Sequence, residues 1–152
     1  MTNPGTRHPF LSEFIAKSVD TATRTMTVVM STNSLDRQGD IVDPGGLLFE
    51  NFLMNPVVLW AHDMSQPPVA KVLSVKALKN RVEAVVQFAD TEFAKEIFGL
   101  YANGFLHAWS IGFIPRRWER IEPSEDGPGG FHVLEAEVVE LSAVPVPANP
   151  EA

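Results

Sequence analysis

The chain has 152 residues, of which 12 are Lys or Arg and 19 are Asp or Glu, so its formal net charge is −7 with neutral histidines. This length is typical of one domain, and a content of 45% hydrophobic and 20% charged residues is typical of a globular protein. The absence of cysteine excludes a disulfide scaffold, a thiolate zinc site and a cysteine nucleophile, and the acid excess argues against binding to nucleic acid.

The N-terminal segment gives no signal for regular structure. Residues 1–11 contain polar residues and two prolines, which predicts a flexible tether followed by a single domain over residues 12–152. The start of the chain lacks the apolar core of a signal peptide, and no stretch approaches the roughly 20 apolar residues of a membrane span. The sequence therefore predicts a protein that stays in the cytoplasm and does not bind membranes.

The next segments predict a hairpin followed by a loop. Residues 14–20 and 25–32 cluster apolar and β-branched side chains on either side of a polar turn, which predicts two strands at an edge of a sheet. Residues 33–46 are dense in Asp, Gly, Asn and Pro, a composition typical of loops. Composition alone does not decide whether this loop is ordered.

The middle of the chain alternates between helix, strand and turn signals. A weak helical pattern over residues 47–54 predicts a short helix. The continuous apolar run at residues 57–61 is typical of a buried strand, so His62 is expected where that strand meets a loop. Residues 69–78 and 81–89 flank a two-residue turn and show strand-like alternation, which predicts a second hairpin.

The last third of the chain contains the clearest helix signal. Residues 93–101 carry a helical apolar pattern between polar caps, residues 105–114 predict an apolar strand interrupted by one serine, and residues 121–130 predict a flexible loop. Residues 131–146 predict one long strand or a pair of strands. About seven strands with few helices indicate a mostly β fold, a closed antiparallel β-barrel with short external helices.

Three polar residues, His62, Ser110 and Glu140, interrupt apolar strand runs. Buried polar groups need partners, so residues placed in this way tend to contact one another. A serine, a histidine and a carboxylate are the parts of a nucleophile, a base and an orienting acid. Each also has a structural explanation, because a lone strand serine usually bonds to backbone and a strand glutamate usually faces solvent. Periodicity leaves both interpretations open.

Other catalytic patterns are absent. The chain has no Gly-x-Ser-x-Gly elbow, because Ala108 stands where the first glycine would be, and it lacks the zinc-protease, P-loop and dinucleotide-binding motifs. Asp36, Asp40 and Asp43 do not have the spacing of a calcium-binding loop, so a structural turn is expected there. The sequence therefore predicts neither a cofactor nor a metal.

Four motifs follow one another along the chain, and their order and spacing are informative. They are residues 36–42 (DRQGDIV), 55–63 (NPVVLWAHD), 109–113 (WSIGF) and 140–150 (ELSAVPVPANP). Together they resemble the tailed-phage prohead, or capsid maturation, serine protease family. The resemblance covers most of the chain, from about residue 31 onward.

The resemblance implies a barrel related in fold to the herpesvirus assembly proteases, and a serine endopeptidase activity. It implies that the substrates are the scaffolding protein or the scaffolding segment of the major capsid protein, and the protease itself. The expected place of action is the phage procapsid in the bacterial host cytoplasm. Self-association of the protease is a further candidate interaction.

The resemblance also assigns roles to residues. Ser110 is similar to the family's nucleophile, His62 to its general base and Glu140 to the third member, although herpesvirus relatives use a second histidine there. The alternative third members are His107 and Asp63. His107 lies three residues before Ser110, which in a strand directs it to the opposite face, and Asp63 is adjacent to His62 and is expected to point away from it.

The oxyanion site is expected near the nucleophile. Backbone N–H groups around Ile111 and Gly112 are candidates, because glycine lets a backbone approach the scissile carbonyl closely. Arg116 and Arg117 resemble the paired arginines near the herpesvirus oxyanion site, but they lie much closer to the serine in sequence here.

Two other functions remain as alternatives. One is a non-catalytic phage structural or scaffold-binding β-barrel module, in which the serine and histidine are merely packed. The other is a metal-dependent hydrolase, for which one His-Asp pair is weak support because three converging ligands are needed. Its candidate ligands are His62, Asp63 and His107.

Overall fold

The computed structural model describes residues 18–125 and 127–152. The tether predicted over residues 1–11 and most of the first predicted strand lie outside the described residues, so the tether and the domain boundary stay predictions. Within the described part of the chain, no helix has the length and apolar character needed to cross a membrane.

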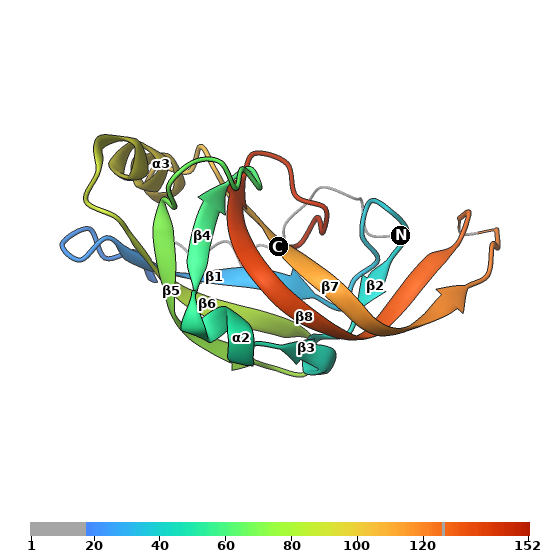
Figure 1. Cartoon of the computed structure of the whole chain (residues 1–152). Helices are drawn as coiled ribbons and strands as arrows, with labels where there is room; N and C mark the ends of the chain where they lie inside the picture. The colour runs from blue at the N-terminus through green and yellow to red at the C-terminus, as the bar shows by residue number, and fades with distance from the viewer. Residues whose placement is uncertain (1–17, 126) are drawn as a thin grey trace.

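The described residues form one eight-stranded sheet that curls into a nearly closed barrel (Figure 1). Its strands are neighbours in the order β1-β6-β5-β4-β8-β2, and β3 and β7 also pair with β8. The mostly β, barrel-shaped fold is therefore confirmed. The strand bounds are β1 Thr25–Thr32, β2 Ile41–Val42, β3 Leu47–Leu48, β4 Val57–Trp60, β5 Ala70–Ala77, β6 Arg81–Phe88, β7 Ala108–Ile121 and β8 Gly130–Val144.

Strand β8 organises the sheet, because it has partners along both edges. Short strands β2, β3 and β4 pair with one edge in turn, all parallel to β8, and β7 pairs antiparallel with the other edge. The barrel therefore has eight strands rather than about seven, and three of its pairings are parallel. Strands of two residues give no periodicity in a sequence, which is why β2 and β3 were predicted as loop and helix.

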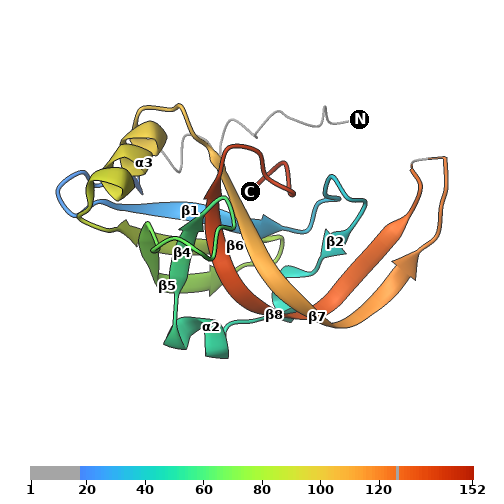
Figure 2. The same ribbon diagram turned by 45° about the horizontal axis from the view of Figure 1, so that its top comes forward.

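The hairpin of β7 and β8 extends beyond the barrel wall, as the two views in Figures 1 and 2 show. The described residues of the loop predicted over residues 121–130 lie between the end of β7 and the start of β8, and the long strand predicted over residues 131–146 is β8. The predicted hairpin over residues 69–89 is also confirmed, since β5 and β6 pair antiparallel. The polar site described below lies at the barrel end of β7 and β8, away from the hairpin tip.

Helix α3 (Glu92–Ala102) covers one end of the barrel (Figure 2). The hydroxyl of Thr91 accepts a hydrogen bond from the Ala94 N–H at 3.3 Å, and Asn103 follows the last turn, as the sequence predicts. The shorter helix α2 (Glu50–Met54) follows β3, so the helix predicted over residues 47–54 begins three residues late. A 3₁₀ turn occupies Pro44–Gly46.

The loop over residues 33–46 is ordered by its own side chains and by the C-terminal segment. One carboxylate oxygen of Asp36 accepts the backbone N–H of Asp40 at 2.9 Å, which confirms a structural turn. The backbone N–H and the Nε of Arg37 donate to the carbonyls of Ala148 and Pro147, each at 2.9 Å. The first and last sequence motifs therefore pack against each other.

Candidate active site

Four residues share the outer face of the β7–β8 pair: Ser110, Gly112, Glu140 and Ser142. In the strand register Ser110 lies opposite Ser142, and Gly112 lies opposite Glu140. Trp109 belongs to the barrel core, and because side chains alternate along a strand, its neighbours face the other way. Directly paired residues in antiparallel strands have Cβ atoms about 4.5–5.5 Å apart, so the four form one compact patch.

Aromatic packing anchors the start of β7. Trp109 is fully buried and stacks on Tyr101 of α3, with 4.6 Å between ring centroids. The Tyr101 hydroxyl donates to the carbonyl of Ala108 at 2.6 Å. The two residues before Ser110 are therefore held firmly, and Ser110 itself is only 7% exposed.

His62 lies in a strained turn directly after β4. The φ angles of Ala61 and His62 are +51° and +60°, in the left-handed region that costs a non-glycine residue about 1–3 kcal/mol. Two hydrogen bonds to β8 hold this turn. The Ala61 N–H donates to the carbonyl of Ala143 at 2.8 Å, and the His62 N–H donates to the hydroxyl of Ser142 at 3.0 Å.

The ring of His62 contacts the carboxylate of Glu140 through a short hydrogen bond between Nδ1 and Oε1. Glu140 is only 2% exposed, and its other oxygen, Oε2, accepts the Ser142 hydroxyl at 2.7 Å. An ionised carboxylate can only accept hydrogen bonds, so in a neutral His62 ring Nδ1 carries the proton and Nε2 has the lone pair. The contact thus fixes the orientation of the ring and leaves Nε2 as the nitrogen that is not bound to Glu140.

Ser110 lies on the same face of the β7–β8 pair as Glu140. Within the described part of the chain, no hydrogen bond joins Ser110 to the His62 ring. It faces Ser142, which in turn binds both His62 and Glu140. Hydrogen bonds between catalytic groups are often long in an enzyme without substrate and shorten when substrate binds. The structure therefore joins the predicted base and acid, and it brings the predicted nucleophile to their side.

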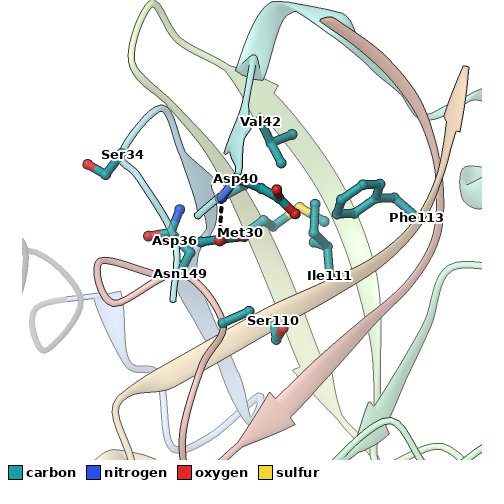
Figure 3. A pocket seen from close by; sticks show the side chains of 11 residues that line it. Met30, Ser34, Asp36, Asp40, Val42, Ser110, Ile111, Phe113 and Asn149 are labelled. Carbon is teal, nitrogen blue, oxygen red and sulfur yellow. Dashed lines mark hydrogen bonds between the residues drawn. The ribbon is translucent and has the colours of Figure 1, made fainter. Parts of the chain in front are cut away.

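A small cavity lies beside Ser110 (Figure 3). Ile111 points into it from β7, Ser110 lies at its margin, and the loop residues Asp36 and Asp40, joined by the hydrogen bond drawn as a dashed line, form another wall. Asn149 from the C-terminal segment completes this side. Three motifs that are far apart in the sequence therefore meet next to the predicted nucleophile.

The two alternative third members are placed elsewhere. Asp63 accepts hydrogen bonds from the hydroxyl and the backbone N–H of Ser65, and these bonds lower the pKa of its carboxyl group. Its carboxylate is thus engaged within its own loop rather than with His62. His107 is exposed and lies before the first residue of β7. The geometry favours Glu140 as the partner of His62.

Arg116 and Arg117 lie in the exposed part of β7. Arg116 forms an ion pair with Glu137 at 2.8 Å, and this guanidinium holds the pKa of the Glu137 carboxyl below its usual value. Six residues of strand, or about 20 Å at roughly 3.3 Å per residue, separate Arg116 from Ser110. This placement does not favour a contact between the arginines and a carbonyl at Ser110.

Ile111 and Gly112 lie closer to the serine. Among the described strands β7 pairs only with β8, so alternate N–H groups of β7 point toward an edge without a strand partner. Such groups are suitable donors to an oxyanion. Their role stays a prediction.

The structure gives Gly112 an additional role. A Cβ atom at this position would lie 2.6 Å from Oε1 of Glu140 and 3.0 Å from its Cγ. A Cβ there would force the Glu140 side chain to shift, so glycine leaves the space that the carboxylate occupies when it contacts His62. This steric requirement depends on the strand register, which the sequence did not reveal.

Gly112→Ala is expected to displace the Glu140 carboxylate and slow any reaction that depends on His62 by about 100-fold, since a misplacement of about 1 Å can have that effect. The rate of peptide cleavage, with thermal unfolding measured in parallel, tests this. Gly99→Ala is the matched control, because a Cβ there meets nothing within 4 Å. Equal rates for the two variants would contradict the steric role.

Ser142 is a residue that sequence reasoning missed. It lies two positions after Glu140, so strand alternation alone would have put both on one face.

The structure also bears on the metal-dependent alternative. Within the part of the chain that the structure describes, no group of three or more His, Cys, Asp or Glu residues could hold a metal ion.

Comparison with known proteins gives a consistent result. The family described as Caudovirus prohead serine protease matches residues 17–152. The chain is 34% identical over 143 residues to the capsid polyprotein of Pseudomonas phage PAJU2, covering 90% of this chain and 20% of the relative. It is 27% identical over 143 residues to the prohead protease of Escherichia phage T5, covering 88% of this chain and 64% of the relative.

The chain thus spans less than two thirds of each of these two relatives. No solved structure matches the chain. The predicted relation to the herpesvirus assembly proteases therefore stays a prediction.

Proposed function

The chain belongs to the caudovirus prohead serine protease family, and from this premise we propose that it is a serine endopeptidase of procapsid maturation. One observation carries the proposal: the buried Glu140 carboxylate binds Nδ1 of His62 beside Ser110. A carboxylate behind a histidine fixes the ring's tautomer and stabilises the imidazolium that forms when the ring takes a proton.

In the proposed reaction, Nε2 of His62 takes the proton of the Ser110 hydroxyl while Oγ attacks the carbonyl carbon of the scissile peptide. The tetrahedral intermediate then breaks its C–N bond, and His62 gives the proton to the leaving amine. The acyl-enzyme that remains is hydrolysed when His62 activates a water in the same way. Glu140 stays ionised throughout and orients the ring.

The developing oxyanion needs hydrogen-bond donors close to Ser110. Backbone N–H groups of β7 near Ile111 and Gly112 are the proposed donors, since one edge of that strand lacks a strand partner among the described residues. Such donors are typically worth about 100- to 1000-fold in turnover.

The proposed substrates are the scaffolding protein or the scaffolding segment of the major capsid protein, and the protease itself. The match to one fifth of a capsid polyprotein and the match to a prohead protease support capsid proteins as the substrate class. The proposed place of action is the procapsid in the host cytoplasm, where copies of the protease would self-associate.

Co-expression of the chain with the capsid and scaffolding proteins of its phage tests this function. The expected result is a capsid protein whose mass falls as its scaffolding segment is removed. A capsid protein of unchanged length in assembled particles would argue for the non-catalytic structural module instead.

Glu140→Gln is expected to lower the cleavage rate by about 10⁴-fold, because the amide keeps the shape of the side chain but loses its charge. The remaining activity should exceed that of variants without nucleophile or base. Steady-state cleavage of a peptide spanning the capsid processing site measures this. Asp63→Asn is the control and should cleave at the wild-type rate; a larger loss there than in Glu140→Gln would move the third role to Asp63.

A further inference from the structure

We infer that Ser142 is a positioning residue that holds Glu140 and His62 in their working arrangement. The inference rests on the proposed function and adds a fourth side chain to it. Ser142 donates its hydroxyl proton to Oε2 of Glu140 at 2.7 Å and accepts the backbone N–H of His62 at 3.0 Å.

The direction of both hydrogen bonds is fixed by chemistry. A backbone N–H can only donate, so the Ser142 oxygen must accept from His62. The single hydroxyl proton is then free for Glu140, whose ionised carboxylate can only accept. The Ser142 side chain thus connects the Glu140 carboxylate to the backbone of His62. Its hydroxyl proton can point only to Glu140, because its oxygen accepts from His62.

Each of these bonds satisfies a group that is costly to leave alone. Glu140 is 2% exposed, and without Ser142 its Oε2 would lose the partner that the structure gives it. The second bond holds the N–H of His62, whose φ of +60° is unfavourable for a histidine. Loss of the hydroxyl would therefore loosen both ends of the His62–Glu140 contact.

Ser142 itself is an unsuitable nucleophile. It is fully buried, and its hydroxyl proton is directed to Glu140 rather than to the His62 ring. It lies opposite Leu59 of β4 on one side and opposite Ser110 of β7 on the other. This central position between the strands of the base and the nucleophile suits a residue that fixes their separation.

Two measurements on the full chain test the inference. The first follows the far-downfield proton resonance expected for a histidine Nδ1–H bound to a carboxylate, which is assigned by its loss in His62→Ala. The second measures the rate at which a fluorophosphonate acylates Ser110. The first does not depend on catalysis, so failure of the inference and failure of the proposed function give different results.

Ser142→Ala is expected to shift or broaden the histidine resonance and to lower the acylation rate by about 10- to 100-fold, the size of effect known for residues that orient metal-bound histidines and carboxylates. In a Glu140→Gln background the same change should cost less than about twofold, because both substitutions act through one carboxylate. Ser31→Ala, which removes another buried strand serine, should leave the resonance in place.

Ser142→Cys keeps the shape of the side chain, although sulfur is larger than oxygen, and replaces a strong donor with a weak one, so it serves if the alanine variant does not fold. An unchanged resonance together with an unchanged acylation rate would overturn the inference. Equal fold losses with and without Glu140 would also overturn it, because Ser142 would then act independently of the acid. If the histidine resonance changes in Ser142→Ala but the fluorophosphonate does not acylate the wild-type chain, only the proposed protease function would be overturned.

Discussion

Ser110→Ala is expected to abolish processing of the capsid protein, with a loss of about 10⁶-fold in turnover, because Ser110 is the proposed nucleophile and removal of the nucleophile from a serine–histidine–carboxylate unit typically has that effect. The substitution deletes one oxygen from a side chain that is 7% exposed at the start of β7. Trp109 and Tyr101 hold the strand independently of the hydroxyl, so the fold should persist. The loss would therefore report on chemistry rather than on unfolding.

The measurement is the mass of the capsid protein over time when it is co-expressed with wild type or with Ser110→Ala. Ser74→Ala is a suitable control, since Ser74 is an exposed serine in β5 that lies outside the site. It should process the capsid protein at the wild-type rate. Processing that continues unchanged in Ser110→Ala would show that another residue is the nucleophile.

His62→Ala is expected to cause a loss of similar size, about 10⁶-fold, since the nucleophile and base of a serine protease act as one unit. Combining it with Ser110→Ala should therefore make the loss no larger. Alanine keeps the backbone N–H that donates to Ser142, so the substitution removes the ring but leaves that hydrogen bond available.

Cleavage of the capsid-site peptide by the single and double variants measures this non-additivity. His107→Ala is the control, because His107 is an exposed histidine outside β7. This variant should cleave the peptide at the wild-type rate. Losses that multiply in the double variant would contradict a shared step. A larger loss in His107→Ala than in His62→Ala would reassign the base.

Much of the fold could be predicted because several segments carry their own periodicity. The alternating side chains of β5 and β6 and the capped apolar pattern of α3 were predicted correctly from local sequence. Strands β2 and β3 were not, because they have two residues each and are defined by long-range backbone pairing with β8. Local patterns contain no information about such pairs.

The contact between His62 and Glu140 could be predicted because polar residues in apolar strands need partners, and the structure shows the two in contact. The supporting structure could not be predicted in the same way. The positive φ angles of Ala61 and His62 occur in a turn that hydrogen bonds to β8 hold, and these bonds join residues about 80 positions apart, so the local sequence does not indicate them. The requirement for Gly112 appears only once the register places Glu140 against it.

The most direct test of the central claim is a peptide map of the chain after reaction with a fluorophosphonate, in particles assembled with the capsid protein. The mechanism predicts a single covalent adduct on the peptide that contains Ser110, and loss of that adduct in His62→Ala. An adduct on a different residue, or no adduct at all in particles that process their capsid protein, would contradict it.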